Sequence, residues 1–252
     1  MTFIEKLDAA VSKNNSLVCV GLDQGTHEFD KIILDATNQY VCVYKLNFAF
    51  YEANGVNGWS DLKKTVEYLK KNHPQIPLIA DAKRGDIGST NQAYAKSIFD
   101  ELGFDAVTVN PYVGREGLQP FLDRADNGII ILCKTSNPGS GEFQDLSTGS
   151  RQALWQKVAE NVVRDWNKNH NCLLVVGATY PEELAQVRKI VGDMTLLVPG
   201  IGAQGGEVEA TVKAGLNSKK AGIIINSSRG IIFADNPGLA AKTLRDTINQ
   251  NR

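Results

Sequence analysis

Three charged residues, Asp81, Lys83 and Asp86, close an otherwise apolar stretch that begins at Leu78. Successive side chains of a β-strand point to opposite faces, so Asp81 and Lys83 lie on the same face of this predicted strand. Ligands of parallel α/β proteins bind at the carboxyl ends of the strands, which is where this pair falls. A carboxylate and an ammonium group in that position form either a structural ion pair or part of a catalytic site.

Polar residues also lie at the ends of other apolar stretches. Asp23 follows the first stretch, Lys45 and Asn47 end the second, and Ser136 follows the fifth. Any one of them alone could be a helix cap or a surface group. Their shared placement predicts that they converge at one mouth of a barrel and form a site there.

Two glycine-rich segments, 199–206 and 226–230, follow the seventh and eighth apolar stretches. Glycine lets backbone amides approach an anion closely, and the loops after the last two strands of such barrels are a frequent phosphate site. Gln204 and Arg229 add side-chain donors, and the guanidinium group of Arg229 suits a phosphate group. The segments therefore predict a phosphorylated small-molecule substrate.

Eight short stretches rich in Val, Ile and Leu alternate with segments of helical periodicity. Continuous apolar residues are typical of parallel strands that are buried on both faces. Eight strand–helix units predict an α/β protein with one (β/α)8 TIM barrel domain over residues 1–252, because a doubly wound sheet normally has fewer strands. The predicted strands are 17–23, 41–47, 77–83, 105–110, 128–134, 172–178, 195–200 and 222–226.

The predicted helices carry apolar residues three and four positions apart. One of them, with Phe3, Leu7 and Ala10 on its apolar face, precedes the first strand, and we expect this extra helix to cover the bottom of the barrel. Another contains Leu62 and is expected to begin at Ser60 as its N-cap. No linker or low-complexity segment interrupts the alternation.

The composition argues against several classes of function. A formal net charge of −1 without a basic cluster argues against nucleic-acid binding. The N-terminus is charged where a signal peptide would be apolar, and no stretch approaches the length of a membrane span, so we expect a cytoplasmic protein. The sequence suggests no metal site, and its cysteines have the spacing of neither a zinc site nor a disulfide framework. We expect buried thiols at Cys19, Cys42, Cys133 and Cys172.

These segments together resemble the orotidine 5'-phosphate decarboxylase family, whose Asp-x-Lys-x-x-Asp motif stands here as Asp81, Lys83 and Asp86. The resemblance covers nearly the whole chain, and the matching segments follow the family's order. Segment 135–144 is similar to the longer bacterial and protozoal branch of the family. The other matching segments are 21–23, 45–47, 134–140, the loop at Pro199, and Arg229.

The resemblance implies decarboxylation of orotidine 5'-phosphate to uridine 5'-monophosphate in de novo pyrimidine biosynthesis, without a cofactor. It further implies a homodimer in which Asp86, Ile87 and Thr90 reach the neighbouring subunit's site. We expect segment 137–145 to share the role of a lid. The implied catalytic residues are Lys45, Asp81, Lys83 and Asp86. The implied substrate contacts are Asp23, Asn47, Ile87, Thr90, Ser136, Pro199, Gly202, Gln204 and Arg229.

The resemblance also implies a role for several of these residues. Asp23 and Thr90 are expected to contact the ribose hydroxyls, Ser136 the pyrimidine amide edge, and Gln204 and Arg229 the phosphate group. Loss of carbon dioxide leaves a localised carbanion, which the ammonium group of Lys83 could stabilise and then protonate.

Two other functions remain open from the sequence. A sugar-phosphate decarboxylase, aldolase or epimerase on the same barrel also places an Asp-x-Lys-x-x-Asp motif at a strand end, but it uses Mg²⁺. A nucleotide-binding barrel without activity would keep the charged residues as a structural network. Resistance of activity to a chelator separates the first from a cofactor-free decarboxylase, and binding without product formation would identify the second.

Overall fold

The apolar stretches fold into eight parallel strands that close on themselves as a barrel, which confirms the predicted fold class. The computed structural model describes residues 1–149, 152–201 and 208–252. Each strand pairs with the next one along the chain, and β8 pairs with β1. The strands are β1 (Val18–Leu22), β2 (Val43–Asn47), β3 (Leu78–Arg84), β4 (Ala106–Val109), β5 (Gly128–Lys134), β6 (Cys172–Val176), β7 (Leu196–Pro199) and β8 (Ile223–Ser227).

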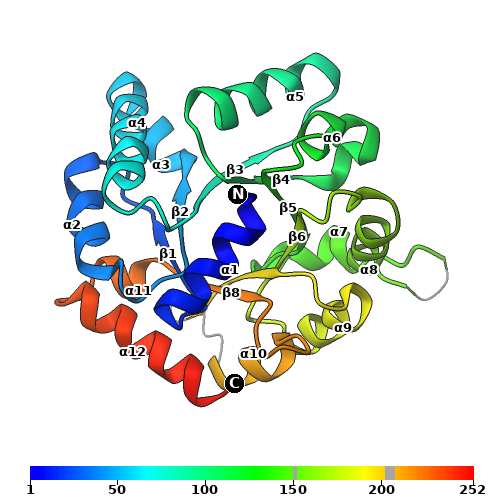
Figure 1. Cartoon of the computed structure of the whole chain (residues 1–252). Coiled ribbons are helices and arrows are strands. Elements are labelled where there is room, and N and C mark those ends of the chain that lie inside the picture. The colour runs from blue at the N-terminus through cyan, green and yellow to red at the C-terminus, as the bar shows by residue number, and fades with distance from the viewer. Residues whose placement is uncertain (150–151, 202–207) are drawn as a thin grey trace.

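Helices surround the barrel as an outer ring, and α1 lies across one end of it (Figure 1). The α-helices are α1 (Phe3–Asn14), α2 (His27–Thr37), α3 (Phe48–Glu52), α4 (Gly55–Asn72), α5 (Gly88–Ala95), α6 (Gly114–Leu122), α7 (Gly141–Gln144), α8 (Leu154–Asn161), α9 (Pro181–Val191), α10 (Val208–Gly215), α11 (Arg229–Ile232) and α12 (Pro237–Gln250). The short segments are the π-helices η1 (Lys96–Glu101) and η4 (Val162–Trp166) and the 3₁₀-helices η2 (Pro111–Val113) and η3 (Pro138–Ser140).

The predicted start of the fourth helix at Ser60 was wrong, because α4 begins at Gly55 and Ser60 lies inside it. The chain already turns at Asn54, whose carbonyl accepts a hydrogen bond from the N–H of Gly58. Gly58 packs so closely on α3 that a Cβ atom there would lie 1.8 Å from the carbonyl oxygen of Tyr51. Tertiary packing of α4 on α3 therefore sets this helix start, and the serine does not.

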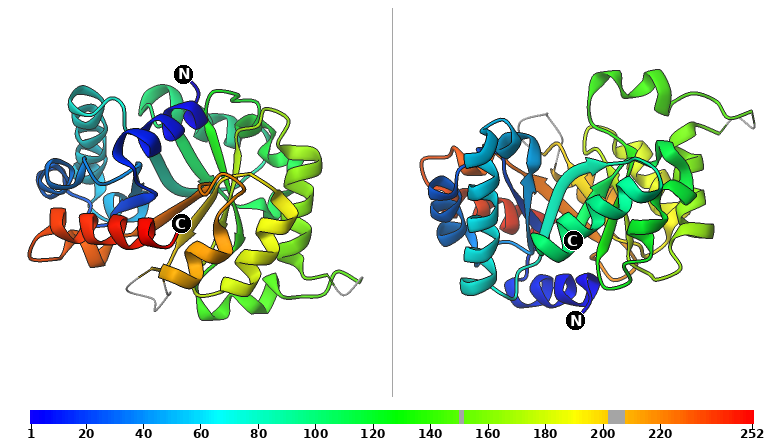
Figure 2. Two further views of the ribbon diagram at one scale, coloured as in Figure 1. Left: turned by 60° about the horizontal axis from the view of Figure 1, so that its bottom comes forward. Right: turned by 90° about the horizontal axis from the view of Figure 1, so that it is seen from above.

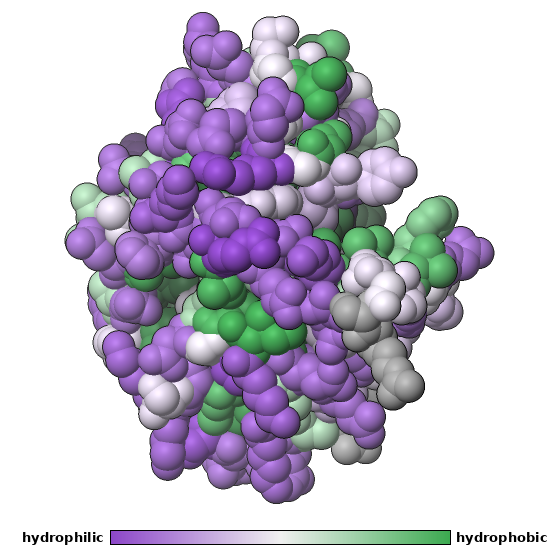
Figure 3. All heavy atoms as spheres, turned by 90° about the vertical axis from the view of Figure 1, so that its right-hand side faces the viewer, coloured by the Kyte–Doolittle hydropathy of each residue, from purple (hydrophilic) through white to green (hydrophobic). Residues whose placement is uncertain are grey.

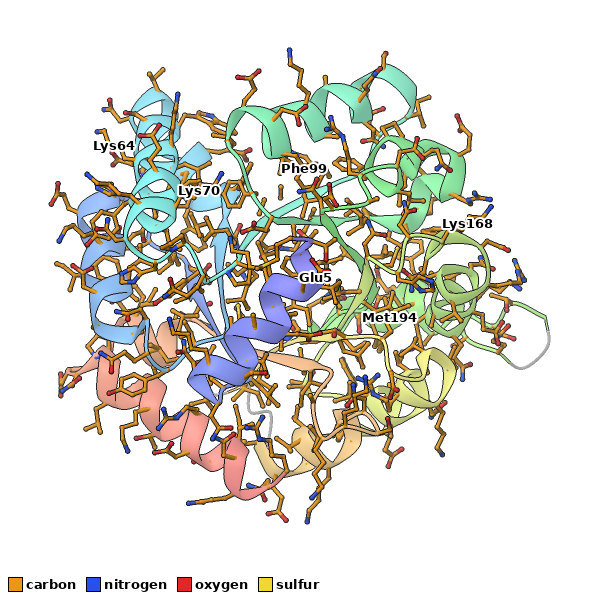
Figure 4. The ribbon with its side chains drawn as sticks, viewed as in Figure 1. Glu5, Lys64, Lys70, Phe99, Lys168 and Met194 are labelled. Carbon is orange, nitrogen blue, oxygen red and sulfur yellow. The ribbon has the colours of Figure 1, made fainter. Side chains whose placement is uncertain are left out.

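The interior of the barrel is filled by apolar side chains that α1 covers from below. Phe3 and Leu7 of α1 belong to the same buried cluster as the inward-facing residues of the strands. Lys6 forms an ion pair of 2.9 Å with Asp105 at the start of β4, which fixes α1 to the barrel. Glu5 lies on the same helix over the end of the barrel (Figure 4). The predicted covering role of the N-terminal helix is confirmed.

The opposite end of the barrel carries the carboxyl ends of the strands. Figure 2 shows α1 at one end and the segment that follows β5 rising from the other. The side of the ring that carries α8 is mostly hydrophilic, with a small hydrophobic patch near its centre (Figure 3). All four cysteines are buried free thiols, as predicted. None of the helices in residues 1–149, 152–201 and 208–252 is long and apolar enough to cross a membrane.

Candidate active site

The two-residue period of the strands places three polar side chains at the upper end of the barrel interior. Lys45 of β2, Asp81 of β3 and Thr108 of β4 each follow an inward-facing core residue by two positions. Because side chains two positions apart share a face, all three point into the barrel. The preceding core residues are Val43, Ile79 and Ala106.

Asp81 lies between two ammonium groups. Its Oδ2 atom is 2.8 Å from Nζ of Lys45, and its Oδ1 atom is 2.6 Å from Nζ of Lys83. The side chains of Asp81 and Lys45 are 8% and 6% exposed, whereas that of Lys83 is 51% exposed and can meet a ligand. The structure therefore brings together three of the four predicted catalytic residues.

Burial and charge act in opposite directions on this group. Burial would raise the pKa of Asp81, but the ammonium groups of Lys45 and Lys83 outweigh it and hold this pKa well below its usual range. Burial would lower the pKa of Lys45, but the carboxylates of Asp81 and Asp23 outweigh it and keep this pKa above its usual range. Asp81 is consequently a carboxylate and Lys45 an ammonium group at neutral pH.

The end of β3 departs from regular pairing with β4. Ala80 pairs with Val107 and Arg84 pairs with Val109, so β3 advances four residues while β4 advances two. Lys83 lies inside this bulge and has a φ angle of 45°, in the left-handed region that residues other than glycine seldom adopt. The bulge therefore contains the residue whose ammonium group pairs with Asp81.

A pocket of about 370 Å³ opens above these side chains. One wall is charged and polar, and the other is apolar, with Leu132, Val175 and Leu197 from β5, β6 and β7. The predicted residues Ser136 and Pro199 reach the same pocket. Its lining consists of Lys45, Asp81, Lys83, Thr108, Leu132, Thr135, Ser136, Asn137, Val175, Leu197 and Pro199.

Ser136 is held by close packing against the end of β6. A Cβ atom at Gly177 would lie 2.7 Å from Cα and 2.8 Å from Cβ of Ser136, so only glycine fits there without displacing the serine. Thr179 also donates a hydrogen bond of 3.4 Å to the carbonyl oxygen of Ser136. These contacts place the predicted pyrimidine contact at the rim of the pocket.

The segment that follows Ser136 is fastened back to β5 by an ion pair. Both carboxylate oxygens of Asp145 lie within 2.8 Å of Nζ of Lys134. The side chain of Lys134 is only 1% exposed, and its ammonium group lies 4.7 Å from the centre of the Tyr180 ring. Gln144 forms two hydrogen bonds with Thr135, each of 2.9 Å. The C-terminal end of the predicted lid segment is thus attached to the end of β5.

Asp86, Ile87 and Thr90 do not line the pocket of their own chain. All three are exposed, Asp86 and Ile87 in the turn between β3 and α5 and Thr90 in the first turn of α5. The backbone of Asp86 is fixed by the buried side chain of Asn91, which accepts a hydrogen bond from its N–H and donates one to its carbonyl. This turn has a defined shape, and it lies outside the pocket of its own barrel.

Asp23 and Asn47 lie at the barrel rim. One carboxylate oxygen of Asp23 is buried without a hydrogen-bond partner among the described residues, and Asp23 does not line the pocket. The side chain of Asn47 instead accepts a hydrogen bond from the N–H of Ala49 and caps α3. Asn47 thus has a structural task that the sequence analysis did not assign to it.

The phosphate prediction is only partly within the described structure. Arg229 is exposed and is the first residue of α11, directly after β8. Gly202 and Gln204 lie outside the described residues. Among the residues that are described, no three His, Cys, Asp or Glu side chains lie together in a metal-binding arrangement.

The sequence analysis did not identify two side chains that lie in or beside the site, Thr108 and Asn91. Thr108 is a polar residue inside an apolar strand, and the same two-residue period that identified Asp81 could have identified it. Asn91 lies in a helix and contacts a turn five residues earlier, and such a contact has no periodic signal in the sequence. Both fix the backbone or side chains of predicted catalytic residues.

Comparisons with known proteins agree with this geometry. Residues 16–244 match the Orotidine 5'-phosphate decarboxylase / HUMPS family. The chain is 47% identical to the orotidine 5'-phosphate decarboxylase of Roseiflexus castenholzii, with 99% of this chain and 98% of that protein covered. It is 48% identical to that of Cellvibrio japonicus, over 94% of this chain and 91% of that protein.

Solved structures give the same result. The OMP decarboxylase of Leishmania donovani superposes with a TM-score of 0.92 at 41% identity, and the match covers 99% of this chain and 98% of that one. The UMP synthase of L. donovani matches with a TM-score of 0.95 at 43% identity, over 100% of this chain and 56% of that one. The expected similarity to bacterial and protozoal relatives is confirmed. The chain therefore belongs to the orotidine 5'-phosphate decarboxylase family, and it is a carboxy-lyase of pyrimidine biosynthesis that decarboxylates orotidine 5'-phosphate.

Proposed function

We propose that Lys45, Asp81, Lys83 and the Asp86 of a neighbouring subunit carry out the decarboxylation. The single observation that supports this most strongly is the placement of Asp81 between two ammonium groups, at 2.8 Å and 2.6 Å, in the floor of a pocket. Of the three residues that meet in the pocket, Lys83 is the exposed one and the one that can face C6 of the pyrimidine. Asp81 is positioned to repel the carboxylate of the substrate.

In this mechanism the C6–carboxylate bond breaks and its electron pair stays on C6. The ammonium group of Lys83 stabilises that charge and then gives C6 a proton, while carbon dioxide leaves. No adjacent carbonyl delocalises the carbanion, so stabilisation has to be electrostatic. Lys45 keeps Asp81 ionised, because its ammonium group opposes the effect of burial on the pKa of Asp81.

The expected magnitudes require several residues to act together. Two unit charges about 4 Å apart interact by about 4 kcal/mol at an effective dielectric constant near 20. Enzymes lower barriers by about 8 to 23 kcal/mol in total. One ion contact is therefore insufficient, and binding of the distant phosphate group has to help hold the pyrimidine against Lys83.

The apolar wall of the pocket contributes in a second way. Leu132, Val175 and Leu197 face the charged group across the pocket. An apolar wall excludes water, and charges interact more strongly where water is excluded. The same wall suits carbon dioxide, an uncharged product without a strong hydrogen-bonding group.

Substrate binding is assigned along the rim of the barrel. We propose that Asp23 binds the ribose, Ser136 the pyrimidine amide edge, and Arg229 with Gln204 the phosphate group. Asn47 contributes through its remaining amide donor, because its oxygen caps α3. Pro199 and Gly202 also belong to the proposed substrate contacts, and segment 137–145 acts as part of the lid.

A homodimer completes each site in this proposal. Asp86, Ile87 and Thr90 are exposed and outside the pocket of their own chain, which fits residues that serve a neighbouring site. Ile87 is 61% exposed, and Tyr112 in the turn after the adjacent strand is 89% exposed. Large apolar side chains exposed together at neighbouring turns are typical of a protein interface. The Asn91 contacts keep the Asp86 turn in a fixed shape for such docking.

Subunit complementation tests the shared site. Lys83→Ala chains and Asp86→Ala chains are each purified as inactive proteins, then mixed under conditions that allow subunits to exchange. A hybrid dimer has one intact site if Asp86 acts in the neighbouring subunit, so random exchange restores about a quarter of parent activity. No recovery, with exchange verified by differently tagged chains, would show that Asp86 acts in its own chain.

We further propose that residues 1–252 form one domain, that the protein is cytoplasmic and that the reaction needs no cofactor.

An assay with a chelator tests the cofactor-free reaction. Orotidine 5'-phosphate is mixed with purified protein with and without EDTA, and ultraviolet absorbance follows the loss of substrate. Equal rates support a cofactor-free reaction. A rate that EDTA abolishes and Mg²⁺ restores would contradict it.

A further inference from the structure

Thr108 joins the backbone of one predicted catalytic residue to the side chain of another. Its Oγ1 atom accepts a hydrogen bond of 2.9 Å from the backbone N–H of Lys83. The same hydroxyl donates a hydrogen bond of 2.9 Å to Oδ1 of Asp81. Thr108 is only 1% exposed, so water cannot readily take over either contact.

The backbone contact exists because of the bulge in β3. In a regular parallel sheet, backbone N–H groups of a strand donate to backbone carbonyls of its neighbours. Between Ala80 and Arg84 the register with β4 shifts, and the N–H of Lys83 donates to the threonine hydroxyl instead of a backbone carbonyl. Lys83 is also held at a φ angle of 45°, a strained conformation that persists only where surrounding contacts enforce it. Thr108 supplies one of those contacts.

The backbone contact with Lys83 determines the direction of the side-chain contact with Asp81. A hydroxyl group has a single proton, and its partners decide the direction in which that proton points. Because the Lys83 N–H occupies an acceptor position on Oγ1, the hydroxyl proton is directed to Asp81. Oδ1 of Asp81 therefore has two donors, the Thr108 hydroxyl and Nζ of Lys83, while Oδ2 is held by Lys45. The plane of the carboxylate is fixed by all three.

We propose that Thr108 is a positioning residue that sets the distance and angle between the Asp81 carboxylate and the Lys83 ammonium group. It acts through these two residues and has no contact of its own with the reacting carbon. The inference rests on the catalytic roles proposed for Asp81 and Lys83. Because a misplacement of about 1 Å at a reacting centre can lower a rate about 100-fold, loss of the hydroxyl reduces kcat.

Valine is nearly the same shape as threonine without the hydroxyl, so Thr108→Val removes both hydrogen bonds and little volume. Thr108→Ser keeps the hydroxyl and removes one methyl group. Thr37→Val is a matched control, because Thr37 is also fully buried and donates a hydrogen bond of 2.7 Å to the carbonyl of Ile33 in α2, outside the pocket. The three variants separate the effect of the hydroxyl from the general effect of losing a buried hydrogen bond.

The measurements are kcat for orotidine 5'-phosphate, the Kd of uridine 5'-monophosphate and the Tm of each variant. Thr108→Val is expected to lower kcat about 100-fold and to change the product Kd less than about threefold. Thr108→Ser should stay within about fivefold of parent kcat, and Thr37→Val should lower Tm as much as Thr108→Val without lowering kcat. A Thr108→Val kcat within about threefold of parent, or a fall in product affinity as large as the fall in kcat, would overturn the proposal.

If Thr108→Val does not fold, Thr108→Ser is compared with Thr108→Ala. At least a tenfold higher kcat for the serine variant supports the proposal, and equal values contradict it. Lys83→Ala in the same assay separates the proposed role of Thr108 from the catalytic role of Lys83 on which it rests. Near-parent turnover by Lys83→Ala would reject the proposed catalytic role of Lys83, whereas an inactive Lys83→Ala beside a fully active Thr108→Val would reject the role of Thr108 alone.

Discussion

Nζ of Lys45 lies 2.8 Å from Oδ2 of Asp81, and the two side chains are 6% and 8% exposed. A buried ion pair of this kind loses hydration that its mutual attraction has to offset, so it is weak evidence for stability alone. Its location at the floor of the pocket, next to the half-exposed Lys83, indicates a role in the site instead. It keeps a carboxylate ionised in a place where an isolated carboxyl group would take up a proton.

Replacement of Lys45 by methionine tests whether the ion pair keeps Asp81 ionised. Lys45→Met leaves Asp81 with a single ammonium partner, so burial is less well opposed and the pKa of Asp81 rises from its depressed position. We expect kcat/KM for orotidine 5'-phosphate to fall about 100-fold or more, the usual effect of removing one preorganised electrostatic contact. Steady-state kinetics measures it.

Lys64→Met is the matched control for Lys45→Met. Lys64 lies on the outer side of α4 (Figure 4), is 57% exposed and pairs with Asp61 at 3.3 Å. Exposed pairs of this type contribute about 0 to 1 kcal/mol to stability, so this variant should keep parent activity. Parent activity in Lys45→Met as well would show that the buried pair has no part in the reaction.

Asp30 should make the stability of the fold depend on pH. Asp30 is fully buried in α2 and accepts hydrogen bonds from Tyr51 at 2.5 Å and Thr65 at 3.3 Å. Burial raises its pKa from 3.8 to about 7. Between these values the folded protein holds a proton that the unfolded chain releases, so the free energy of unfolding falls as the pH rises through this window. The total fall is about 4 kcal/mol for a shift of this size.

Asp30→Asn is neutral at every pH and keeps an oxygen for Tyr51 and Thr65. We compare the free energy of unfolding in urea of this variant with that of the parent protein. The difference, variant minus parent, should increase by about 2 to 4 kcal/mol between pH 4.5 and pH 8. Asp165→Asn is the control, because a hydrogen bond from Arg164 lowers the pKa of Asp165 and places its titration below the window. An Asp30→Asn curve parallel to that of the parent would contradict a raised pKa at Asp30.

The Lys134–Asp145 pair should govern substrate binding more than turnover. Asp145→Asn leaves the ammonium group of Lys134, which is 1% exposed, without its counter-charge. An unpaired buried charge is destabilising by several kcal/mol, so segment 135–145 should shift until Lys134 is solvated. Because Ser136 belongs to this segment, we expect KM for orotidine 5'-phosphate to rise about tenfold with a smaller change in kcat.

Asp100→Asn is the matched control for that variant. Asp100 also receives two hydrogen bonds from one cation, Arg124, at 2.9 Å each, but both side chains lie at the surface. It should leave KM unchanged. If Asp145→Asn also leaves KM unchanged, the ion pair does not hold the lid segment in its binding position.

The sequence was sufficient to predict the strands, and the side chains that share one face of a strand, because continuous apolar stretches and the two-residue period of a strand are visible in it. The strands were found because parallel strands buried on both faces need continuous Val, Ile and Leu, and the end points differ by at most two residues from those of the structure. The pair of Asp81 and Lys83 was found because it stands on one face of β3. Lys45 followed by the same rule on β2.

The sequence was insufficient where the structure depends on contacts between distant segments. The bulge at Lys83 appears only in the pairing of β3 with β4, and its backbone N–H donates to a hydroxyl group of β4, which the sequence of β3 by itself does not reveal. The start of α4 depends on packing against α3 rather than on the capping preference of Ser60. The attachment of Asp86 depends on Asn91, whose side chain reaches back to the turn before its own helix.

The most direct test of the proposed chemistry is the turnover of Lys83→Ala. Purified variant and parent are incubated with orotidine 5'-phosphate, uridine 5'-monophosphate is quantified by chromatography, and binding of added uridine 5'-monophosphate is measured on the same samples. We predict a rate lower by about 10⁴-fold or more with product binding still measurable, because Lys83 supplies both the stabilising charge and the proton. Turnover close to that of the parent protein would contradict the assignment of Lys83 and the mechanism built on it.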